Sequence, residues 1–596
     1  MIDKPLQDEP TPLTPGDKFA QKMTWIFCAS FGFFLFFYAI RPIYDPDFWW
    51  HLKTGEIMVE NGGWLQFDPF TFSGDGVVSA RETLILKGYW LWQLAAYGFY
   101  SFFGFNGIFL LNLLTLGAMA GVVIQQLRRF QVGYPLIALL LSLGFYLLRA
   151  HYPLERPQII SFLLATMLLA LLARVREGRP LGWTLPLLML LWANLHGGFV
   201  VGVLILLCFA AGAVLEYRHD LPRLRHLLGW TSVGIAASLL NPTGALVFFE
   251  LINFQSSVLQ QGVMEYQSTW AALQQGYGYI VILWLLIVFY AVGVWSARRL
   301  YWPDLMVAIF LVIFSVAYIR NIGFFAIAML PSIGFYLQQG ARRRQVVFPS
   351  LAPGLLLALC SILLLCFSYN DWQDRQRQGA GPVRSIYPEQ AIAFLRDSGL
   401  QGRMFNSYEY GGYLLWRLYP QRQVFIDGRG MEEKVFVDCQ KIMQASTTRI
   451  EGRREYERLL DSYAIDFIFQ RINDNDGRIH PLMKSLLLKP EWVPVYLDNF
   501  VYILARRSAG NADVINTYQI DTNDFKKRLL FIFNAICQSS PNEIGFQVGR
   551  AEVLLYLGMY DEAKAQVEAI AAVAPQNQFL PGLQRDLDIL RRFIRR

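Results

Sequence analysis

Ionisable side chains crowd into the stretch that directly follows the first strongly apolar segment, residues 23–40. They are Asp45, Asp47, His51, Lys53 and Glu56. Ionisable groups beside a bilayer are costly and usually mark function. A carboxylate can accept a proton or hold a metal ion, and cationic side chains can hold an anion. We therefore predict catalytic roles for Asp45, Asp47 and His51. Lys53 and Glu56 are candidate substrate-binding residues, and Asp47 is the candidate ligand of a divalent cation, Mg or Mn.

The composition is that of a membrane protein in its larger part. Hydrophobic residues make up 54% of the 596-residue chain and charged residues only 17%, whereas soluble domains average about 25% charged residues. A formal net charge of +7 could indicate nucleic-acid binding. Most basic clusters, however, stand in short loops between apolar segments, where they act as topology signals. We therefore expect no nucleic-acid partner.

Apolar segments that are long enough, or nearly long enough, to cross a bilayer recur as far as about residue 370. The sequence predicts about eleven spans, at residues 23–40, 105–126, 134–149, 159–174, 183–197, 199–216, 227–241, 277–297, 303–319, 322–338 and 351–369. The predicted organisation is a leader over 1–22, a polytopic α-helical membrane domain over 23–370, an α/β domain over 385–515 and a helical segment over 521–596.

The basic residues of the loops predict the topology. With the N-terminus in the cytoplasm, the arginine clusters of every alternate loop also lie inside, among them Arg128-Arg129, Arg298-Arg299 and Arg342-Arg343-Arg344. An odd number of spans then places the Asp45 loop and everything after residue 370 outside. The predicted location is a bacterial inner (plasma) membrane, crossed several times, with the C-terminal domain in the periplasm.

The predicted outer loops carry further candidates. The cationic ones could hold a phosphate group at the bilayer surface, and they are Arg81, Lys87, Arg149, His151, Arg156 and Arg320. Glu265 is a candidate substrate-binding carboxylate of the fourth outer loop. The alternative is that His51 and Lys53 snorkel at the interface and that Arg149, Arg156 and Arg320 anchor lipid headgroups. Asp45 could instead cap a helix that runs to Glu60, with Pro46 at its first position.

The region after residue 384 shows an α/β pattern. The sequence predicts helices over 388–398 and 453–463, strands over 423–426 and 467–469, and a hairpin over 493–505 around Asp498-Asn499. From about residue 521 the pattern is helical, and Leu557-Gly-x-Tyr560 with the residues after it fits one tetratricopeptide (TPR) repeat. One repeat is not stable alone. We expect it to pack on the preceding domain or on a protein partner.

Two short motifs resemble a known family. Asp45-Pro46-Asp47, followed by an aromatic-rich helix that ends in Glu60-Asn61-Gly62, resembles the catalytic subunit of oligosaccharyltransferase and related GT-C glycosyltransferases. Residues 406–413, Asn-Ser-Tyr-Glu-Tyr-Gly-Gly-Tyr, and then 424–429, Val-Phe-Ile-Asp-Gly-Arg, are similar in layout to the family's Trp-Trp-Asp-Tyr-Gly segment and the residues after it. Ser407 and Tyr408 stand where the family has its two tryptophans.

The resemblance implies a GT-C-like fold and a function. It implies transfer of a sugar or glycan from a polyprenyl-phosphate-linked donor in the bilayer to a protein, lipid or glycan acceptor on the periplasmic side. It also implies that an acidic residue of the first loop binds a metal ion and orients the acceptor. Tyr408, Glu409 and Tyr410 become candidate substrate-binding residues, because this segment reads the glycosylation sequon in the family.

Two other classes of protein remain open. A lipid or polysaccharide transporter, or flippase, predicts ionisable residues in the middle of spans and a repeated span pattern, whereas the charges here stand at span ends. A non-enzymatic scaffold for envelope assembly is consistent with the TPR-like segment. A scaffold does not need the acidic first loop.

Overall fold

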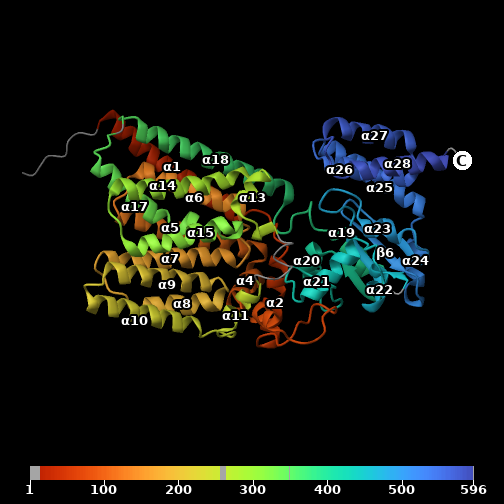
Figure 1. Ribbon diagram of the computed structural model, residues 1–596, viewed down its shortest axis with the longest axis horizontal. Coiled ribbons are helices and arrows are strands. Elements are labelled where there is room, and N and C mark those ends of the chain that lie inside the picture. The colour runs from red at the N-terminus through yellow and green to blue at the C-terminus, as the bar shows by residue number, and fades with distance from the viewer. Residues whose placement is uncertain (1–13, 255–263, 348, 451, 595–596) are drawn as a thin grey trace, which may run out of the picture. The chain divides into compact units, whose positions relative to one another are not determined.

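The chain folds into two compact units (Figure 1). The computed structural model describes residues 14–254, 264–347, 349–450 and 452–594. The first unit comprises Met1–Asp45, Thr54–Gln66 and Ser79–Val383, and the second comprises Pro46–Lys53, Phe67–Val78 and Arg384–Arg596. Residues 1–13 of the predicted leader, residues 255–263 of the fourth outer loop and residues 595–596 lie outside the described residues. The predicted ranges of the four regions stay predictions.

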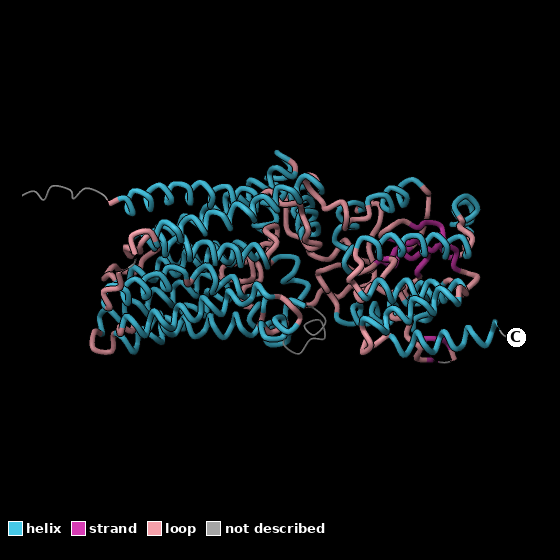
Figure 2. The backbone as a smooth tube through the Cα atoms, turned by 90° about the horizontal axis from the view of Figure 1, so that it is seen from above, coloured by secondary structure: helices cyan, strands magenta, loops and turns pink. Residues whose placement is uncertain are grey.

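The first unit is helical, and its long helices lie side by side (Figures 1 and 2). Its longer helices are α1 (Pro15–Ala39), α4 (Trp90–Phe103), α5 (Phe105–Arg129), α6 (Tyr134–His151), α7 (Gln158–Arg176), α8 (Thr184–Leu195), α9 (Phe199–Glu216), α10 (Leu221–Ser238), α14 (Val281–Ala297), α15 (Trp302–Ala317), α17 (Leu330–Arg343) and α18 (Ala352–Gln378). Its shorter ones are α3 (Ala80–Lys87), α11 (Leu246–Phe254), η1 (Met264–Tyr266), α13 (Thr269–Gln274), η2 (Gly278–Ile280), η3 (Ile319–Asn321) and α16 (Ile322–Ala328). α1 packs along α18, and α14 packs along α17. Helix α2 (Phe48–Asn61) has residues in both units.

Every apolar segment predicted to be a span is helical, but the predicted count of about eleven spans is not confirmed. In the part of the chain that the structure describes, seven helices are long and apolar enough to cross a membrane, or eight if α16 and α17, bent by 50°, form one span. α8 has only 12 residues and is therefore about 18 Å long, against a hydrocarbon core of about 30 Å. The first unit is thus a polytopic helical membrane protein whose span number stays open.

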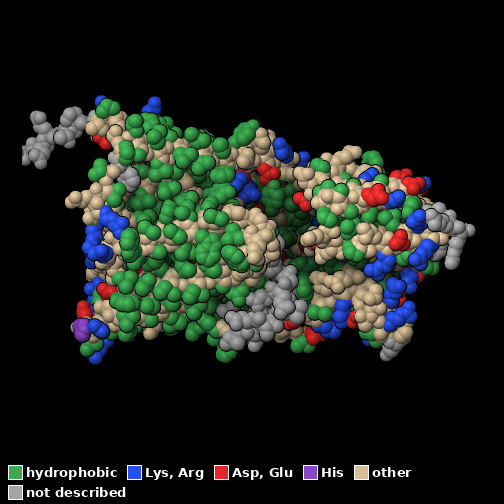
Figure 3. Space-filling view, turned by 45° about the horizontal axis from the view of Figure 1, so that its top comes forward, with side chains coloured by type: hydrophobic (Ala, Val, Ile, Leu, Met, Phe, Trp, Pro, Cys, Tyr) green, Lys and Arg blue, Asp and Glu red, His purple; other side chains and the backbone are tan. Residues whose placement is uncertain are grey.

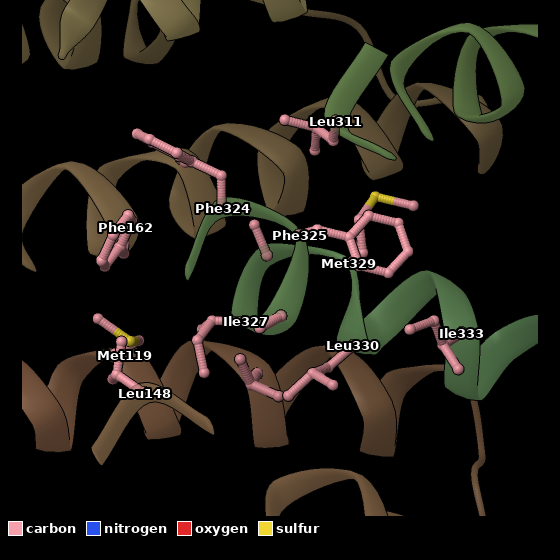
Figure 4. Packing of buried hydrophobic residues seen from close by; sticks show 14 of the residues in the cluster. Met119, Leu148, Phe162, Leu311, Phe324, Phe325, Ile327, Met329, Leu330 and Ile333 are labelled. Carbon is pink, nitrogen blue, oxygen red and sulfur yellow. The ribbon is translucent and has the colours of Figure 1, made fainter. Parts of the chain in front are cut away.

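The core of the bundle depends on close packing around α16. In Figure 4, Phe324, Ile327 and Leu330 lie among side chains of neighbouring helices, Phe162 and Leu148 among them. A Cβ atom added to Gly323 would lie 2.5 Å from the Phe162 ring, so only glycine lets α16 approach α7 this closely. The packing fixes the loop that immediately precedes α16.

The loops gather at two ends of the bundle. At one end Arg342 Nη2 donates to the Gln131 carbonyl at 3.1 Å, and Arg343 Nη1 donates to the Ala297 carbonyl at 3.3 Å. α6 starts at this end, at Tyr134, and its 18 residues end at His151, beside the predicted outer loops. In Figure 3 hydrophobic side chains cover the visible face of the bundle, and Lys and Arg side chains gather where α1 begins. The helices therefore separate the predicted inner loops from the predicted outer loops.

The second unit contains a four-stranded sheet with the order β1-β4-β6-β5. Its strands are β1 (Arg403–Asn406), β4 (Ile465–Arg471), β5 (Trp492–Leu497) and β6 (Val501–Arg506). β1 and β4 are parallel, and the other pairs are antiparallel. The remaining elements are β2 (Arg449–Ile450), β3 (Arg453–Arg454), α19 (Glu389–Asp397), α20 (Tyr408–Leu418), α21 (Glu433–Met443), α22 (Glu455–Ser462), α23 (Pro481–Leu486), η4 (Ala509–Asn511) and α24 (Ala512–Tyr518). The predicted hairpin is confirmed, with the Asp498 carboxylate accepting from the N–H groups of Phe500 and Val501 at 2.8 Å.

Two local predictions are wrong. Residues 423–426 form no strand, and Val424 makes only an isolated bridge to Thr71. α2 starts at Phe48 rather than at Pro46, and the carbonyl of Asp47 accepts from the His51 N–H at 3.4 Å. Asp47 therefore occupies the helix start that was predicted for Asp45.

The chain ends in four helices, α25 (Thr522–Ser539), α26 (Ile544–Leu557), α27 (Tyr560–Val573) and α28 (Leu580–Ile594). α26 and α27 form a hairpin, and Gly558, with a φ of 76°, ends α26 in the left-handed conformation that glycine favours. Val548, Ala563 and Leu583 belong to one shared apolar core. The helical character of this region is thus observed, and its assignment as a TPR stays a prediction.

The separation of the loops generates a topology test. An alkaline phosphatase reporter, which is active only outside the cytoplasm, should be active when fused after Arg596 and inactive when fused after Arg343. A fluorescent protein that folds only in the cytoplasm should give the opposite pattern. The same assays with both patterns reversed would place the second unit in the cytoplasm and overturn the predicted orientation.

Candidate functional site

A single guanidinium joins three outer segments of the first unit. Arg156, in the loop between α6 and α7, pairs with Asp45 and with Glu265 of η1. Asp45 is only 3% exposed, and its segment is held by a hydrogen bond from the Ile43 N–H to the Gly381 carbonyl at 2.8 Å. A buried carboxylate is stable as an ion only when it is paired. Asp45, Arg156 and Glu265 therefore form one network, to which α1, α7 and η1 each contribute an adjoining segment.

A second buried carboxyl lies beside this network. Glu155 is 6% exposed, and its Oε1 accepts a hydrogen bond from the Tyr44 N–H at 3.3 Å. Burial raises the pKa of Glu155 to about 7, and the negative charge of Asp45 acts in the same direction. In contrast, burial alone would raise the pKa of Glu265, but the guanidiniums of Arg156 and Arg320 outweigh it and lower that pKa. Beside the two carboxylates that Arg156 pairs, Asp45 and Glu265, the site thus holds one carboxyl, Glu155, that binds a proton near neutral pH.

Two further predicted residues, Arg320 and His151, lie in the same group of loops. Arg320 of η3 donates to the Tyr266 hydroxyl, and its guanidinium carbon lies 4.7 Å from the centre of that ring. The Arg320 carbonyl accepts from the Tyr152 hydroxyl and from Gln158 Nε2, both at 2.6 Å. His151 Nδ1 lies 2.8 Å from the Tyr279 hydroxyl. The second, fourth and fifth outer loops therefore converge.

Arg149 has a different environment. Its Nε and Nη2 donate to the two oxygens of Asp371 at 2.8 and 2.6 Å, and Arg41 Nε lies 3.5 Å from the same carboxylate. Asp371, on α18, is 2% exposed. The two donors of the Arg149 guanidinium thus neutralise a buried carboxylate, which is a structural role.

The residues of the first loop after Asp45 belong to the second unit. A Cβ atom added to Gly428 would lie 1.9 Å from Asp47 Oδ1, so the carboxylate lies directly against that glycine. His51 is buried. Lys53 Nζ lies 6.0 Å from the centre of the Tyr419 ring, within cation–π range. Trp49, which stands between Asp47 and His51 in the sequence, packs against Tyr387, Tyr413 and Trp416.

Glu56, Arg81 and Lys87 belong to the first unit and stand on other helices than the Arg156 network. Glu56 lies on α2 and acts electrostatically on Tyr97 of α4. Arg81 and Lys87 lie on α3, which packs against α11. Lys87 Nζ donates to Gln66 Oε1 at 3.2 Å. Their substrate-binding roles stay predictions.

The segment that resembles Trp-Trp-Asp-Tyr-Gly starts helix α20. Asn406 Nδ2 donates to the Ile426 carbonyl at 2.8 Å, and Asn406 Oδ1 accepts from the Phe425 N–H at 2.7 Å. The Tyr408 hydroxyl donates to the Gly428 carbonyl at 2.9 Å. Tyr410 is buried, and Glu409 Oε2 is a buried atom that accepts no hydrogen bond from the described residues. The two motifs of this region thus form one folded structure.

The arginine that holds this structure together was not predicted to have a role. Arg429 donates to both oxygens of Asp68, at 2.7 and 3.1 Å, and to both oxygens of Asp427, at 2.8 and 2.5 Å. All three side chains are nearly inaccessible, and the two carboxylates outweigh burial and raise the pKa of Arg429. Asp427-Gly-Arg429 was visible as a motif, but its partner Asp68 stands 359 residues earlier than Asp427, and no sequence signal links them.

The predicted metal site has no matching set of donors. A divalent cation such as Mg needs several oxygen ligands in octahedral geometry. The described ranges contain no group of three or more His, Cys, Asp or Glu side chains that could hold a metal ion. Asp45 is bound by Arg156. The described residues therefore offer no ready-made protein site for the predicted Mg or Mn ion at Asp47, and no step of the chemistry is assigned to it.

Comparison with solved structures identifies the fold. The chain is similar to the Archaeoglobus fulgidus oligosaccharyltransferase, in a crystal structure that tethers the enzyme through a disulfide bond to an acceptor peptide containing the NVT sequon. The TM-score is 0.50 at 12% identity, over 82% of this chain and 74% of the archaeal one. The fold is that of an oligosaccharyltransferase. No family model and no curated protein matches the sequence. The oligosaccharyltransferase resemblance read from the two short motifs is thus confirmed at the level of fold.

Glu155 generates a pH-dependent prediction. At pH 4 its carboxyl is protonated in the folded and the unfolded chain. Between its ordinary pKa of 4.5 and its folded value of about 7, the unfolded chain ionises first and the fold loses stability. At about 1.4 kcal/mol per pKa unit the loss is about 3 kcal/mol above pH 7. Glu155→Gln keeps an acceptor for the Tyr44 N–H and cannot ionise, so its thermal midpoint in detergent should exceed that of the native chain at pH 8 and equal it at pH 4.

The exposed Glu562→Gln is the matched control and should follow the native protein at both pH values. A Glu155→Gln protein that loses stability at pH 8 would show that the carboxyl is ionised and paired, contrary to this assignment.

Proposed function

We propose that this protein is a membrane glycosyltransferase that moves a sugar or glycan from a polyprenyl-phosphate-linked donor to a protein, lipid or glycan acceptor on the periplasmic side of a bacterial inner membrane. The observation that carries the proposal is the convergence of Asp45, His151, Arg156, Glu265 and Arg320 at one end of a bundle with an oligosaccharyltransferase fold. Ionisable groups in a membrane protein are retained mainly where they serve function.

The first unit supports donor binding. The phosphate of a lipid-linked sugar sits at the bilayer surface, where a helix end of this bundle would lie. Arg320 and His151 are hydrogen-bonded through aromatic hydroxyls, which leaves the charge of Arg320 less neutralised than that of Arg149 or Arg156, whose partners are carboxylates. We assign the donor phosphate to Arg320, with His151 beside it. Arg156 positions Glu265 and Asp45.

The second unit supports acceptor binding. The archaeal enzyme of similar fold was solved with an acceptor peptide. In this chain Glu409 keeps a buried oxygen without a hydrogen bond from the described residues, and Tyr408 and Asp47 both contact Gly428. A hydroxyl or amide of an acceptor would satisfy such an oxygen. We assign acceptor recognition to Tyr408, Glu409 and Tyr410, and orientation of the attacking group to Asp47.

The chemistry follows from these roles. The acceptor heteroatom forms a bond to the anomeric carbon while the bond from that carbon to the phosphate oxygen breaks. The electron pair leaves with the polyprenyl phosphate, whose added charge Arg320 stabilises. The proton of the acceptor passes to a carboxylate, and we assign this step to Asp47. Asp45, paired with Arg156, fixes the start of the loop that carries Asp47.

Asp47→Asn tests the acceptor assignment. The substitution is nearly isosteric but removes the charge that accepts the proton, and general-base catalysis contributes about 10²–10⁴-fold. Transfer from polyprenyl-linked sugar, measured in proteoliposomes with a panel of labelled donors and a total envelope extract as acceptor, should fall about 100-fold or more. The exposed Asp513→Asn, in the same unit, should keep native activity. Native transfer by a well-folded Asp47→Asn protein would remove Asp47 from the mechanism.

Arg320→Lys tests the donor assignment. Lysine keeps the positive charge but cannot make the bidentate hydrogen bonds that a guanidinium makes to phosphate. Loss of one charge-assisted hydrogen bond, roughly 1.5–3 kcal/mol, should weaken donor use about tenfold or more. The measurement is a donor titration at fixed acceptor, with the exposed Arg585→Lys as control. If only the dependence on acceptor changes, Arg320 belongs to the other substrate; if neither changes, it anchors lipid headgroups.

A further inference from the structure

The second unit contains an open pocket of about 680 Å³ whose lining includes neither Asp47 nor the residues assigned to the acceptor. Its walls are the ends of α19 and α20, the segment that leads into β1, and Phe72. Their polar side chains are those of four arginines and three glutamines. This volume falls within the range of about 300–1,000 Å³ that small-molecule sites occupy, so the pocket admits more than a single ion.

Four guanidiniums line the pocket, and none of the lining residues is acidic. Arg396 is exposed and makes no ion pair or hydrogen bond with the described residues. Arg417 lies 3.1 Å from Glu389, which is 42% exposed, so the pair is partly solvated. Arg403 donates to the Tyr463 carbonyl at 3.2 Å, and Arg422 donates to the Leu400 carbonyl. Only one of the four is thus neutralised by a side-chain ion pair among the described residues.

A structural role accounts for part of this charge. Arg396 and Arg417 stand in the last turns of α19 and α20, where a cation favours the helix dipole. Arg403 and Arg422 belong to neither helix. The backbone N–H of Arg403 donates to Asp466 Oδ2 at 2.8 Å. Helix stabilisation therefore explains two of the four arginines and leaves the concentration of charge unexplained.

Amide side chains separate the arginines. Gln401 and Gln421 are exposed, and Gln423 Nε2 donates to the Pro69 carbonyl at 3.0 Å, which leaves its oxygen available. Amide groups both donate and accept hydrogen bonds and so suit hydroxyl groups. Guanidiniums suit carboxylate and phosphate through paired donors. Gly402, with a φ of 93°, brings the backbone to the wall of the pocket.

We propose that this pocket binds an acidic saccharide, a sugar chain that carries a carboxylate or a phosphate. The arginines hold the anionic group, and the glutamines hold neighbouring hydroxyls. The site is separate from the proposed transfer reaction, so it stands or falls independently of that function. It would let the second unit hold an anionic glycan of the cell envelope.

Binding to the full-length protein in detergent tests the proposal. The probes are trigalacturonic acid, glucose 6-phosphate, neutral maltotriose and inorganic phosphate, each titrated by calorimetry. Trigalacturonic acid or glucose 6-phosphate should bind at least about tenfold tighter than maltotriose and than inorganic phosphate, which is about 1.4 kcal/mol. The stronger of the two identifies carboxylate or phosphate as the anionic group.

Paired variants locate the site. Arg396→Gln with Arg417→Gln should weaken the preferred acidic probe at least tenfold, whereas Arg449→Gln with Arg585→Gln, which removes two exposed arginines of the same unit, should leave it unchanged. Arg396→Gln alone should weaken it severalfold, and since Arg396 has no partner among the described residues the fold should survive. Equal binding of maltotriose, equal binding of inorganic phosphate, equal loss in both double variants, or no binding of any probe would each overturn the proposal.

Discussion

The end of the helical bundle where the predicted outer loops lie depends on one electrostatic constraint, which is that the buried carboxylate of Asp45 must be paired. Arg156 meets it and at the same time holds Glu265. Removing one partner of a buried ion pair is strongly destabilising, because the remaining charge is then uncompensated. The pairing therefore fixes the segment after α1, the loop between α6 and α7, and η1. In the second unit Arg429 pairs with the carboxylates of Asp68 and Asp427 and so satisfies the same constraint.

This constraint also distinguishes the arginines of the first unit by their partners. A guanidinium that is already hydrogen-bonded to carboxylates is electrostatically neutralised and attracts a phosphate only weakly. Arg149 and Arg156 are both bonded to carboxylates in this way. Arg320 is held through a phenol hydroxyl and through its own backbone, so its position is fixed while its charge is not cancelled at contact. The structure thus distinguishes Arg149 and Arg156, which pair with carboxylates, from Arg320, which is hydrogen-bonded to a phenol hydroxyl.

The sequence predicted what is encoded locally and missed what depends on distant partners. The apolar segments, the hairpin at Asp498 and the start of the terminal helices follow from hydropathy and turn chemistry within a few residues. Residues 423–426 have strand-like composition, but their neighbour is Thr71, and they form one bridge rather than a ladder. The alternative role of Asp45 as a helix cap followed from its neighbour Pro46, because its partner Arg156, 111 residues away, is not visible from local sequence.

The Asp-x-Asp pattern was the best signal in the chain, and its two carboxylates have different roles. Asp45 belongs to the first unit, is buried, and serves the Arg156 network. Asp47, two residues later, belongs to the second unit, begins α2 and lies against Gly428. A shared metal ion would need both carboxylates as oxygen donors, but Arg156 occupies one of them. The two carboxylates of the motif therefore differ in their surroundings: Asp45 is paired with Arg156 in the first unit, and Asp47 lies against Gly428 in the second.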